Sequence, residues 1–250
     1  MKRHIIVHPD FLYIKEFIDR IPEFFETEGE VLYKSRNTIK IFATGDLRLN
    51  VKRYRMPSFI NRIVYSFFKR TKADKAFYNS NEVITKGFET PASVAFIEDY
   101  SYKLLGYSYY VSLQIDDAEE IRNYYYGPLS GNEKLYSAFA RYSAQLHKNG
   151  IYHLDYSPGN VLINTTDNSF NFILVDINRM KFMKVSPKLG CRNFRRMFGN
   201  DDVYKFIAAE YASETGIDRD FCEKWILRYK NRFLRYSAGK KAFKKMLKSI

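Results

Sequence analysis

The alternation of apolar and polar residues early in the chain predicts three short strands. The stretches VLYKS, TIKIFAT and LRLNVKRY are rich in β-branched and aromatic residues, as strands typically are. Turn-forming residues separate them at Ser35-Arg36-Asn37 and at Gly45-Asp46. We therefore predict an antiparallel meander in this region.

The spacing of apolar residues then changes from a strand to a helix pattern. A first helix is predicted from the apolar positions Phe59, Ile60, Ile63, Val64, Phe67 and Phe68. A second helix is predicted over 73–86, and it carries Glu82. Beyond Gly87 and Pro91, SVAFIED and YYVSLQI read as strands, with KLLGY between them as a further strand.

The second half of the chain is predicted to be mainly helical. Leu135, Phe139, Tyr142 and Leu146 follow one another at helical intervals, and Asn149-Gly150 ends that helix. VLIN and FILVD predict a short hairpin around Thr166-Asp167-Asn168, and the chain from Lys188 onward is mostly helical. We expect an α+β chain with a β-rich first lobe over 1–113 and a mainly helical second lobe over 114–250.

Composition limits the class of protein. The 250 residues are 46% apolar, which is enough for one large domain or two lobes with real cores. The formal charge of +13 indicates an anionic partner, which could be nucleic acid, an anionic membrane face or a phosphorylated substrate. Cys191 and Cys222 show no metal-binding spacing, so we expect a reducing compartment and no disulfide framework.

The first residues and the longest apolar runs indicate where in the cell the protein is expected. The start, MKRHIIVHPDF, is basic and then apolar, but His8, Pro9 and Asp10 interrupt it too early for a signal peptide. No run reaches the roughly 18–20 apolar residues that a membrane span needs. We therefore expect a cytoplasmic protein that touches a membrane surface without crossing it.

Five polar residues have the order that ATP-dependent phosphoryl transfer needs. HLDYSPGNVLIN carries Asp155 and Asn160, LVDINR carries Asp176 at the end of a strand, and Lys52 and Glu82 lie on a strand and a helix of the first lobe. Such a reaction uses a lysine on the phosphates, a carboxylate that orients it, an aspartate and an asparagine on Mg²⁺, and a second aspartate that accepts a proton. The order is that of the protein-kinase-like fold.

Each residue alone has a simpler interpretation. Lys52 could be a solvated strand lysine, Glu82 an exposed helix carboxylate, and Asp155 with Asn160 a pair of Asx turns. Asp176 could simply be the residue that begins a turn. The five in order and at suitable spacing are much harder to obtain by accident, so we predict a protein-kinase-like bilobal fold whose first lobe carries a glutamate-bearing helix.

HLDYSPGNVLIN and LVDINRMKF resemble the lipopolysaccharide core kinases of the Kdo/WaaP family. The family pattern H-x-D-x-x-x-x-N, followed by a strand ending in D-[LIF]-x-R, matches His153, Asp155, Asn160, Asp176 and Arg179. RNTIKIF, LRLNVKRYR and NEVITKGFETPASVAF are similar to the family's first lobe. The resemblance covers roughly residues 30–182 and is loose beyond them.

The resemblance implies a role for each matched residue. Lys52 would contact the ATP phosphates and pair with Glu82, and Asp155 would be the catalytic base. Asn160 and Asp176 would ligate Mg²⁺, and His153 would orient the catalytic loop. Adenine would bind to backbone groups near Leu113, Gln114 and Ile115.

The implied reaction is phosphorylation of a sugar, Kdo or heptose, in the inner core of lipopolysaccharide. The partner would be a lipid-A-linked core oligosaccharide at the cytoplasmic face of the inner membrane, and its negative charge would suit the basic chain. The sequence leaves open which sugar and hydroxyl react and what the oligomeric state is.

Two departures from other kinases stand out. The first hairpin turn, YKSRNTIK, lacks a glycine-rich loop. Arg36 could cover the phosphates in its place, or the turn could simply be exposed to solvent, and the sequence does not decide between the two. Ile177-Asn178 replaces Phe-Gly after the metal aspartate, and only a short segment follows, which favours a small or glycan acceptor over a protein.

Basic residues concentrate at 48–75 and at 224–248. The first region could lie on an anionic membrane, it could receive an acidic lipid-linked sugar, or Phe59, Ile63 and Phe67 could pack on the first lobe. The second region has Phe233, Leu234, Phe243, Met246 and Leu247 among its lysines, and it could contact a membrane or be a solvated helix with one packed face. Rival functions are an atypical protein Ser/Thr kinase, a pseudokinase and a nucleic-acid-binding protein, and the intact carboxylate set argues against the last two.

Overall fold

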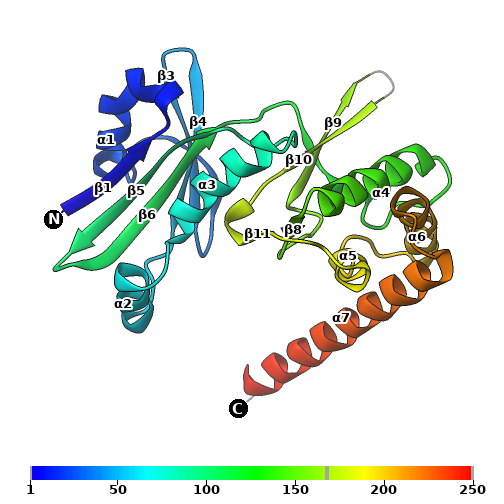
Figure 1. Cartoon of the computed structure of the whole chain (residues 1–250). Coiled ribbons are helices and arrows are strands. Elements are labelled where there is room, and N and C mark those ends of the chain that lie inside the picture. The colour runs from blue at the N-terminus through cyan, green and yellow to red at the C-terminus, as the bar shows by residue number, and fades with distance from the viewer. Residues whose placement is uncertain (1, 167–168, 249–250) are drawn as a thin grey trace. The chain divides into compact units, whose positions relative to one another are not determined.

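The computed structural model describes residues 2–166 and 169–248, except for the side chains of Lys241 and residues 244–248, and it divides into two compact units (Figure 1). Unit 1 comprises Met1–Asp116 together with Asp176–Arg179. Unit 2 comprises Asp117–Val175 and Met180–Ile250. Four residues that lie late in the sequence thus belong to the first unit. The lobe boundary at 113/114 stays a prediction.

Unit 1 is built on one six-stranded antiparallel sheet. Its strand order is β1-β5-β6-β4-β3-β2, so the predicted meander forms one half of the sheet and is confirmed. The strands are β1 (Lys2–Val7), β2 (Glu30–Lys34), β3 (Thr38–Thr44), β4 (Leu47–Tyr54), β5 (Ser93–Ser101) and β6 (Leu104–Leu113).

Helices cover both faces of this sheet, α1 (Lys15–Phe24) on one side and α3 (Lys72–Thr85) on the other. Successive residues of a strand point to opposite faces. Ile97 and Tyr109 therefore join the core under α1, whereas Phe96 and Tyr110 join the core under α3. The 3-10 turn η1 (Pro9–Ile14), α1 and β1 were not predicted, although Ile14, Ile18, Ile21 and Phe25 already follow one another at helical intervals.

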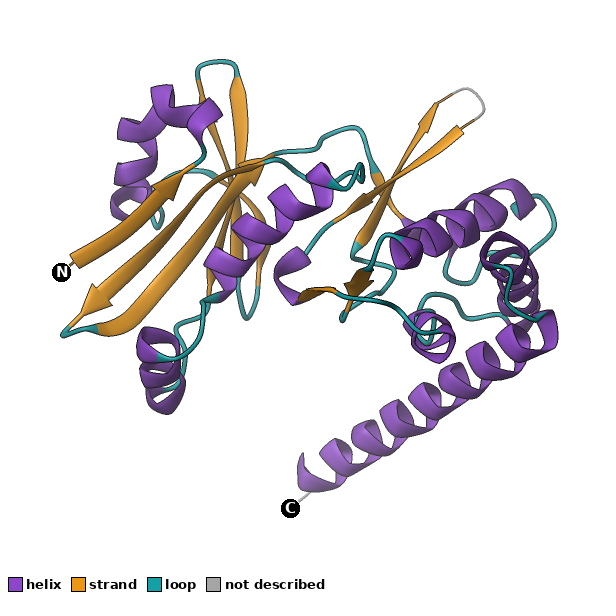
Figure 2. Ribbon diagram, viewed as in Figure 1, coloured by secondary structure: helices purple, strands orange, loops and turns teal. Residues whose placement is uncertain are grey.

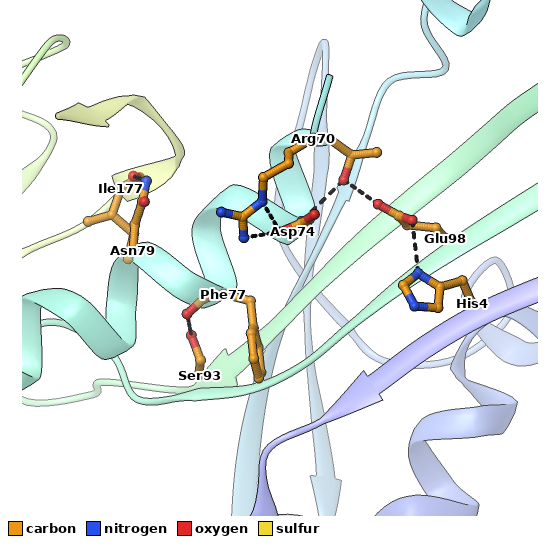
Figure 3. Close-up of polar contacts among 9 residues, drawn as sticks. His4, Arg70, Asp74, Phe77, Asn79, Ser93, Glu98 and Ile177 are labelled. Atoms are coloured by element: carbon orange, nitrogen blue, oxygen red, sulfur yellow. Dashed lines mark hydrogen bonds and ion pairs between the residues drawn. The ribbon is translucent and has the colours of Figure 1, made fainter. Parts of the chain in front are cut away.

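Helix α3 is tied to the sheet by side-chain hydrogen bonds (Figure 3). Thr71 is its N-cap, and the hydroxyl accepts a bond from the Asp74 N–H at 3.1 Å. The same hydroxyl donates to Glu98 Oε1 at 2.6 Å. Further along, Ser93 Oγ donates to the Phe77 carbonyl oxygen at 3.1 Å. These bonds set the position of α3 on β5.

The predicted separate strand KLLGY is wrong. Tyr102 and Lys103 both have positive φ angles, 50° and 65°, and they form a two-residue turn that joins β5 to β6. Such a turn follows the right-handed twist of the two strands. Leu104 therefore already belongs to β6, and β5 and β6 form one long hairpin. Neither glycine nor asparagine marks the turn, so its sequence signal was missing.

Helix α2 (Phe59–Phe67) exposes large apolar side chains. Phe59 is 64% exposed, Ile60 74% and Phe68, just beyond the helix, 78%. The alternative in which Phe59, Ile63 and Phe67 pack on the first lobe is therefore wrong for Phe59 and for Phe67, which is 59% exposed, whereas Ile63 is half-buried.

Strand β2 forms an open edge of the sheet. All five of its residues are exposed, and Val31, Leu32 and Tyr33 are among them. The pairing with β3 shifts register between Val31 and Tyr33, which marks a bulge.

Unit 2 is mainly helical, as predicted (Figure 2). Its core gathers aromatic rings around Phe139, which contacts Tyr156, Phe172, Phe194 and Phe198. The helices are α4 (Glu133–Lys148), α5 (Pro187–Asn193), α6 (Asp201–Thr215) and α7 (Arg219–Lys248), and the 3-10 turn is η2 (Ile121–Tyr124).

Short strands of unit 2 flank the loop that was predicted to be catalytic. The predicted hairpin is confirmed as a β9–β10 pair, although its turn residues Asp167 and Asn168 lie outside the described residues. The strands are β7 (Glu119–Glu120), β8 (Ile151–His153), β9 (Val161–Thr166), β10 (Ser169–Leu174) and β11 (Met180–Phe182). The helix predicted to end at Asn149-Gly150 does so, and Gly150 adopts a φ of 73°.

His147 is buried in unit 2 between two polar partners. The Asn193 amide nitrogen lies 3.1 Å from His147 Nε2, and the Tyr211 hydroxyl lies 2.9 Å from Nδ1. Burial lowers the pKa of His147 to about 3. The imidazole is thus neutral, with Nε2 accepting from Asn193 and Nδ1 donating to Tyr211.

No helix within the described ranges has both the length and the apolar character needed to span a bilayer.

Candidate active site

Unit 1 places a lysine against the aspartate that was predicted to bind metal. Lys52 lies on β4, in register with Ile39 of β3 and Tyr110 of β6. Its Nζ is 2.5 Å from Asp176 Oδ1, and the Asn178 amide nitrogen donates to the same oxygen at 2.7 Å. Asp176 has a φ of 55°, a left-handed conformation that is costly outside glycine and that clusters at functional sites.

Helix α3 holds the segment that follows Asp176. The Asn79 side-chain amide donates to the Ile177 carbonyl oxygen at 2.7 Å (Figure 3). Ile177 begins the 3-10 turn η3 (Ile177–Arg179), which packs against α3. Asn79 is therefore a positioning residue, and the sequence pattern did not single it out.

The predicted ion pair between Lys52 and Glu82 is wrong. Glu82 Oε1 lies 3.4 Å from Lys86 Nζ on the same helix, its side chain is 46% exposed, and Lys52 pairs with Asp176 instead. The physical reason is the rotation of α3 about its axis. Its buried stripe consists of Ala73, Ala76, Phe77, Ser80 and Val83. That stripe leaves Glu82 at the solvent side of the helix.

Two lysines flank the ring of Tyr54 at the end of β4. Lys52 Nζ is 5.4 Å and Lys72 Nζ is 5.9 Å from the ring centroid. Burial, with the Asp176 carboxylate nearby, raises the pKa of Tyr54 well above its ordinary value, so its hydroxyl stays protonated. Burial lowers the pKa of Lys72, and the nearby Arg36 guanidinium lowers it further. This part of unit 1 is therefore strongly cationic.

In unit 2, His153 holds the backbone of the predicted catalytic loop. The histidine is buried, and its Nδ1 accepts a hydrogen bond from the Asp155 N–H at 3.0 Å. The proton is then on Nε2, which donates to the Val175 carbonyl oxygen at 3.1 Å. One ring thus connects the residue before Asp176 in the chain to the backbone of Asp155, which is what an orienting role requires.

Asn160 adds a second set of bonds to the same loop. Its side-chain amide donates to the Asp155 carbonyl oxygen at 2.8 Å, and its own carbonyl accepts from the Val175 N–H at 3.1 Å. The backbone of Val175 is therefore bonded on both sides, to Asn160 and to His153. The conformation of the loop and the start of the Asp176 segment are fixed together.

The Asp155 carboxylate contacts an arginine that the sequence pattern did not indicate. Arg196 Nη1 lies 2.5 Å from Asp155 Oδ1. Arg196 comes from the connection between α5 and α6, forty-one residues further along the chain. Nothing in the local sequence marks such a long-range partner.

The predicted adenine-binding segment ends β6. The Gln114 N–H donates to the Arg48 carbonyl oxygen at 2.8 Å, and the Ile115 carbonyl accepts from the Gln114 side chain at 2.6 Å. Asn50 also donates to the Gln114 side-chain oxygen at 2.8 Å. Backbone binding of adenine near Leu113, Gln114 and Ile115 stays a prediction.

The hairpin turn that replaces a glycine-rich loop is well defined. Ser35 N–H donates to the Asn37 carbonyl at 3.0 Å, and Asn37 Oδ1 accepts from the Arg55 N–H at 3.1 Å. Arg36 at its tip is exposed. Both interpretations of Arg36, a phosphate ligand or a plain exposed turn, fit this geometry.

The donor set suits a metal that is held partly by nucleotide phosphates. Within the described ranges, no three His, Cys, Asp or Glu residues gather as a metal cluster. A kinase metal needs fewer protein ligands, because phosphates and water complete its coordination. The Asn160 amide uses its nitrogen on Asp155, which leaves the amide oxygen as a cation ligand. Asp176, in unit 1, supplies a carboxylate, so each of the two residues taken by itself is of a kind that Mg²⁺ accepts.

The family model described as "Lipopolysaccharide kinase (Kdo/WaaP) family" matches residues 23–208. The chain belongs to the Kdo/WaaP family. It is therefore a kinase, a phosphotransferase with an alcohol group as acceptor. No curated protein matches the chain by sequence.

The chain is also similar to solved structures. A structure titled "WaaP in complex with acyl carrier protein" is 14% identical, with 92% of this chain and 98% of that chain covered and a TM-score of 0.63. WbdD bound to the kinase inhibitor LY294002 is 13% identical, with 81% and 45% covered and a TM-score of 0.46. A kinase-domain mutant of PknI from Mycobacterium tuberculosis is 13% identical, with 76% and 74% covered and a TM-score of 0.40. The likeness to WaaP confirms the predicted α+β, protein-kinase-like fold.

Proposed function

We propose that this Kdo/WaaP-family kinase transfers the γ-phosphoryl group of ATP to a hydroxyl of Kdo or heptose in the inner core of lipopolysaccharide. The observation that carries the proposal is the contact between Lys52 and Asp176, in a chain whose family phosphorylates lipopolysaccharide. The acceptor would be a core oligosaccharide linked to lipid A.

Each residue has one task in this reaction. Asp155 accepts the proton of the attacking hydroxyl, which typically contributes 10²–10⁴-fold to such a rate. Lys52 binds the α- and β-phosphates, and Asn160 and Asp176 ligate Mg²⁺. When bound, Mg²⁺ neutralises charge on the phosphates. His153 keeps Asp155 in place through its backbone, and Arg36 is proposed to contact the phosphates from the hairpin turn.

The Lys52–Asp176 contact suggests how the nucleotide is received. Without an anion, the two side chains neutralise each other at 2.5 Å. Lys52 would bind the nucleotide phosphates and Asp176 would hold the accompanying Mg²⁺, so each of the two groups would keep an opposite charge beside it.

The chain beyond Asp176 supports a small acceptor. Directly after η3, β11 pairs with β8, Met180 opposite His153, and α5 begins at Pro187. This leaves little chain for a long segment on which a protein substrate could dock.

We further propose that α2 attaches the enzyme to an anionic membrane, at the cytoplasmic face of the inner membrane. The exposed Phe59, Ile60 and Phe68 support this, together with the basic residue Lys69 that follows the helix. Apolar side chains enter the acyl boundary while lysine and arginine face anionic head groups.

The deciding experiment is transfer of labelled γ-phosphate from ATP to purified Kdo–lipid A and to heptosylated core, with Asp155→Ala as the control. Label on the sugar that disappears in the variant supports the proposal. Label confined to the protein itself would favour an atypical protein kinase. No transfer, with strong salt-sensitive binding to RNA or DNA, would favour a nucleic-acid-binding protein.

A further inference from the structure

Unit 1 contains a cavity of about 540 Å³ beside the Lys52–Asp176 contact. Its walls come from the β2–β3 turn, the end of β4, α2, the start of α3 and β6. It shares Tyr54 and Lys72 with the candidate active site, since both lysines of that site lie against the Tyr54 ring. A ligand in the cavity is therefore next to the reaction centre.

The cavity is cationic. Arg36, Arg55 and Lys72 contribute to its lining, and none of its described lining residues is an aspartate or a glutamate. Other arginines of unit 1 are neutralised: Arg3 contacts Asp99, and Arg48 contacts Asp116. Arg55 and Lys72, by contrast, form no ion pair with any carboxylate among the residues that the structure describes. Neither charge is therefore held in an ion pair at the cavity wall.

The excess of positive charge in the cavity affects the pKa of Lys72. Lys72 is half-buried, and burial together with Arg36, Arg179 and Lys52 lowers its pKa, against the opposing effect of Asp176. Its position in the first turn of α3, directly after the N-cap Thr71, adds the positive end of the helix dipole. An anion in the cavity would favour the charged form of Lys72 and so oppose each of these effects.

The mouth of the cavity is amphipathic. Ser58 and Asn61 line it and are hydrogen-bonded to each other at 3.0 Å, and Met56 lines it with a 39% exposed side chain. Phe59 and Ile60, both largely exposed, directly follow Ser58. A cationic hollow next to exposed apolar side chains fits an anionic group that is attached to a lipid.

We propose that Arg55 and Lys72 bind a phosphate or carboxylate group of the lipid-linked acceptor in this cavity, and so hold the acceptor beside Lys52 and Asp176. The inference rests on the proposed function and names an acceptor subsite for it. The nucleotide phosphates, which the proposal assigns to Lys52 and Arg36, would occupy a neighbouring position.

The main test is steady-state kinetics of the full-length enzyme. We compare Arg55→Gln/Lys72→Gln with Lys148→Gln/Lys205→Gln, which removes two exposed charges from unit 2. Charged hydrogen bonds are worth roughly 1.5–3 kcal/mol, so KM for the acceptor should rise about 10- to 100-fold in the first variant only. Equal rises in KM for ATP and acceptor, or an unchanged acceptor KM, would overturn the proposal. Arg55→Gln alone serves if the double variant unfolds.

Two modified acceptors identify the anionic group. One lacks the lipid A phosphates, and the other has its sugar carboxylate reduced to an alcohol. Wild-type enzyme should show a raised KM for one of the two, and the Arg55→Gln variant should no longer distinguish that acceptor from the intact one. If wild-type enzyme has the same KM for the intact acceptor and for both modified acceptors, the cavity does not bind either group.

A binding measurement separates this inference from the proposed function. Lys72 is acetylated with acetic anhydride, without ATP, and its labelling is followed by mass spectrometry. Detergent micelles that contain diphosphoryl lipid A should protect Lys72 at least about tenfold and leave Lys148 labelled, whereas micelles of neutral detergent should protect neither. Protection without sugar phosphorylation would keep the subsite and reject the reaction. Sugar phosphorylation without protection of Lys72, together with an acceptor KM that is unchanged in Arg55→Gln/Lys72→Gln, would keep the reaction and reject the subsite.

Discussion

The side-chain amide of Asn79 lies 2.7 Å from the carbonyl oxygen of Ile177, so helix α3 is bonded to the residue that follows Asp176. In this kinase α3 thus contacts the segment that carries Asp176 through a neutral hydrogen bond. Movement of α3 would pull on the segment that carries Asp176.

We expect Asn79→Ala to lower kcat about 2- to 10-fold, because one hydrogen bond of 0.5–1.5 kcal/mol then no longer positions Asp176. The measurement is phosphate transfer at saturating ATP and acceptor. Asn81→Ala, on the same helix, is the matched control and should keep wild-type kcat. Equal effects of the two variants would show that only helix stability matters.

We expect Glu82→Gln to change activity less than about twofold, because an exposed ion pair such as Glu82–Lys86 contributes little. Lys52→Met, in contrast, removes the partner of Asp176 and the proposed phosphate ligand, and should lower kcat/KM by about 10² or more. Comparable losses in the two variants would mean that Lys52 meets Glu82 once the nucleotide is bound.

Asp155→Asn should lower phosphate transfer by about 10²–10⁴-fold, since an amide cannot accept the proton of the sugar hydroxyl. ATP affinity, measured by calorimetry, should stay near that of wild type. The control is Asp202→Asn, an exposed change in the first turn of α6. Retained transfer in Asp155→Asn would remove this residue from the role of base.

The buried His147 predicts a loss of stability in acid. Its pKa is about 3 in the folded protein and about 6.5 in an unfolded chain, so only the unfolded state gains a proton between those values. The contribution is fully present above pH 6.5 and is lost as the pH falls toward 3. Between pH 6 and pH 5, the free energy of unfolding should fall up to about 1.4 kcal/mol more in wild type than in His147→Gln. Parallel denaturant titrations of the two proteins measure this, and equal slopes would contradict it.

Liposome binding should depend on the exposed side chains next to the cavity. Ile60→Ser/Phe68→Ser removes apolar groups worth roughly 1.5–3 kcal/mol each, so co-sedimentation with anionic vesicles should weaken at least about tenfold. Leu12→Ser/Tyr13→Ser, which changes two other exposed apolar residues, should bind like wild type. Added salt should weaken binding of wild type. Equal binding by all three proteins at every salt concentration would reject α2 as the membrane contact.

Much of the fold was predictable because its elements follow simple periodicity. Alternation along TIKIFAT and LRLNVKRY marks β3 and β4, and the apolar steps from Leu135 to Leu146 mark α4. The turn at Tyr102 and Lys103 was missed because its positive φ angles fall on residues that seldom adopt them. Strand β1 carries too little pattern of its own and is defined by pairing with β5.

The candidate site was predictable as a set of residue types but not as a set of contacts. The order of Lys52, Asp155, Asn160 and Asp176 indicates a kinase, whereas the partner of each side chain depends on packing. The small and apolar residues Ala73, Ala76, Ser80 and Val83 already define the buried face of α3, and they place Glu82 off it. That stripe was the available signal. Arg196 had none, because its contact with Asp155 spans two separate parts of the sequence.

The bulge in β2 has a consequence for handling the enzyme. An open edge strand that presents Val31, Leu32 and Tyr33 offers free N–H and C=O groups to a strand from another molecule. The break in register at these residues spoils the even spacing that such a strand would need, and Lys34 places a charge beside it. The register break and the charge thus disfavour edge-to-edge aggregation at the border of the sheet that leads into the Ser35-Arg36-Asn37 turn.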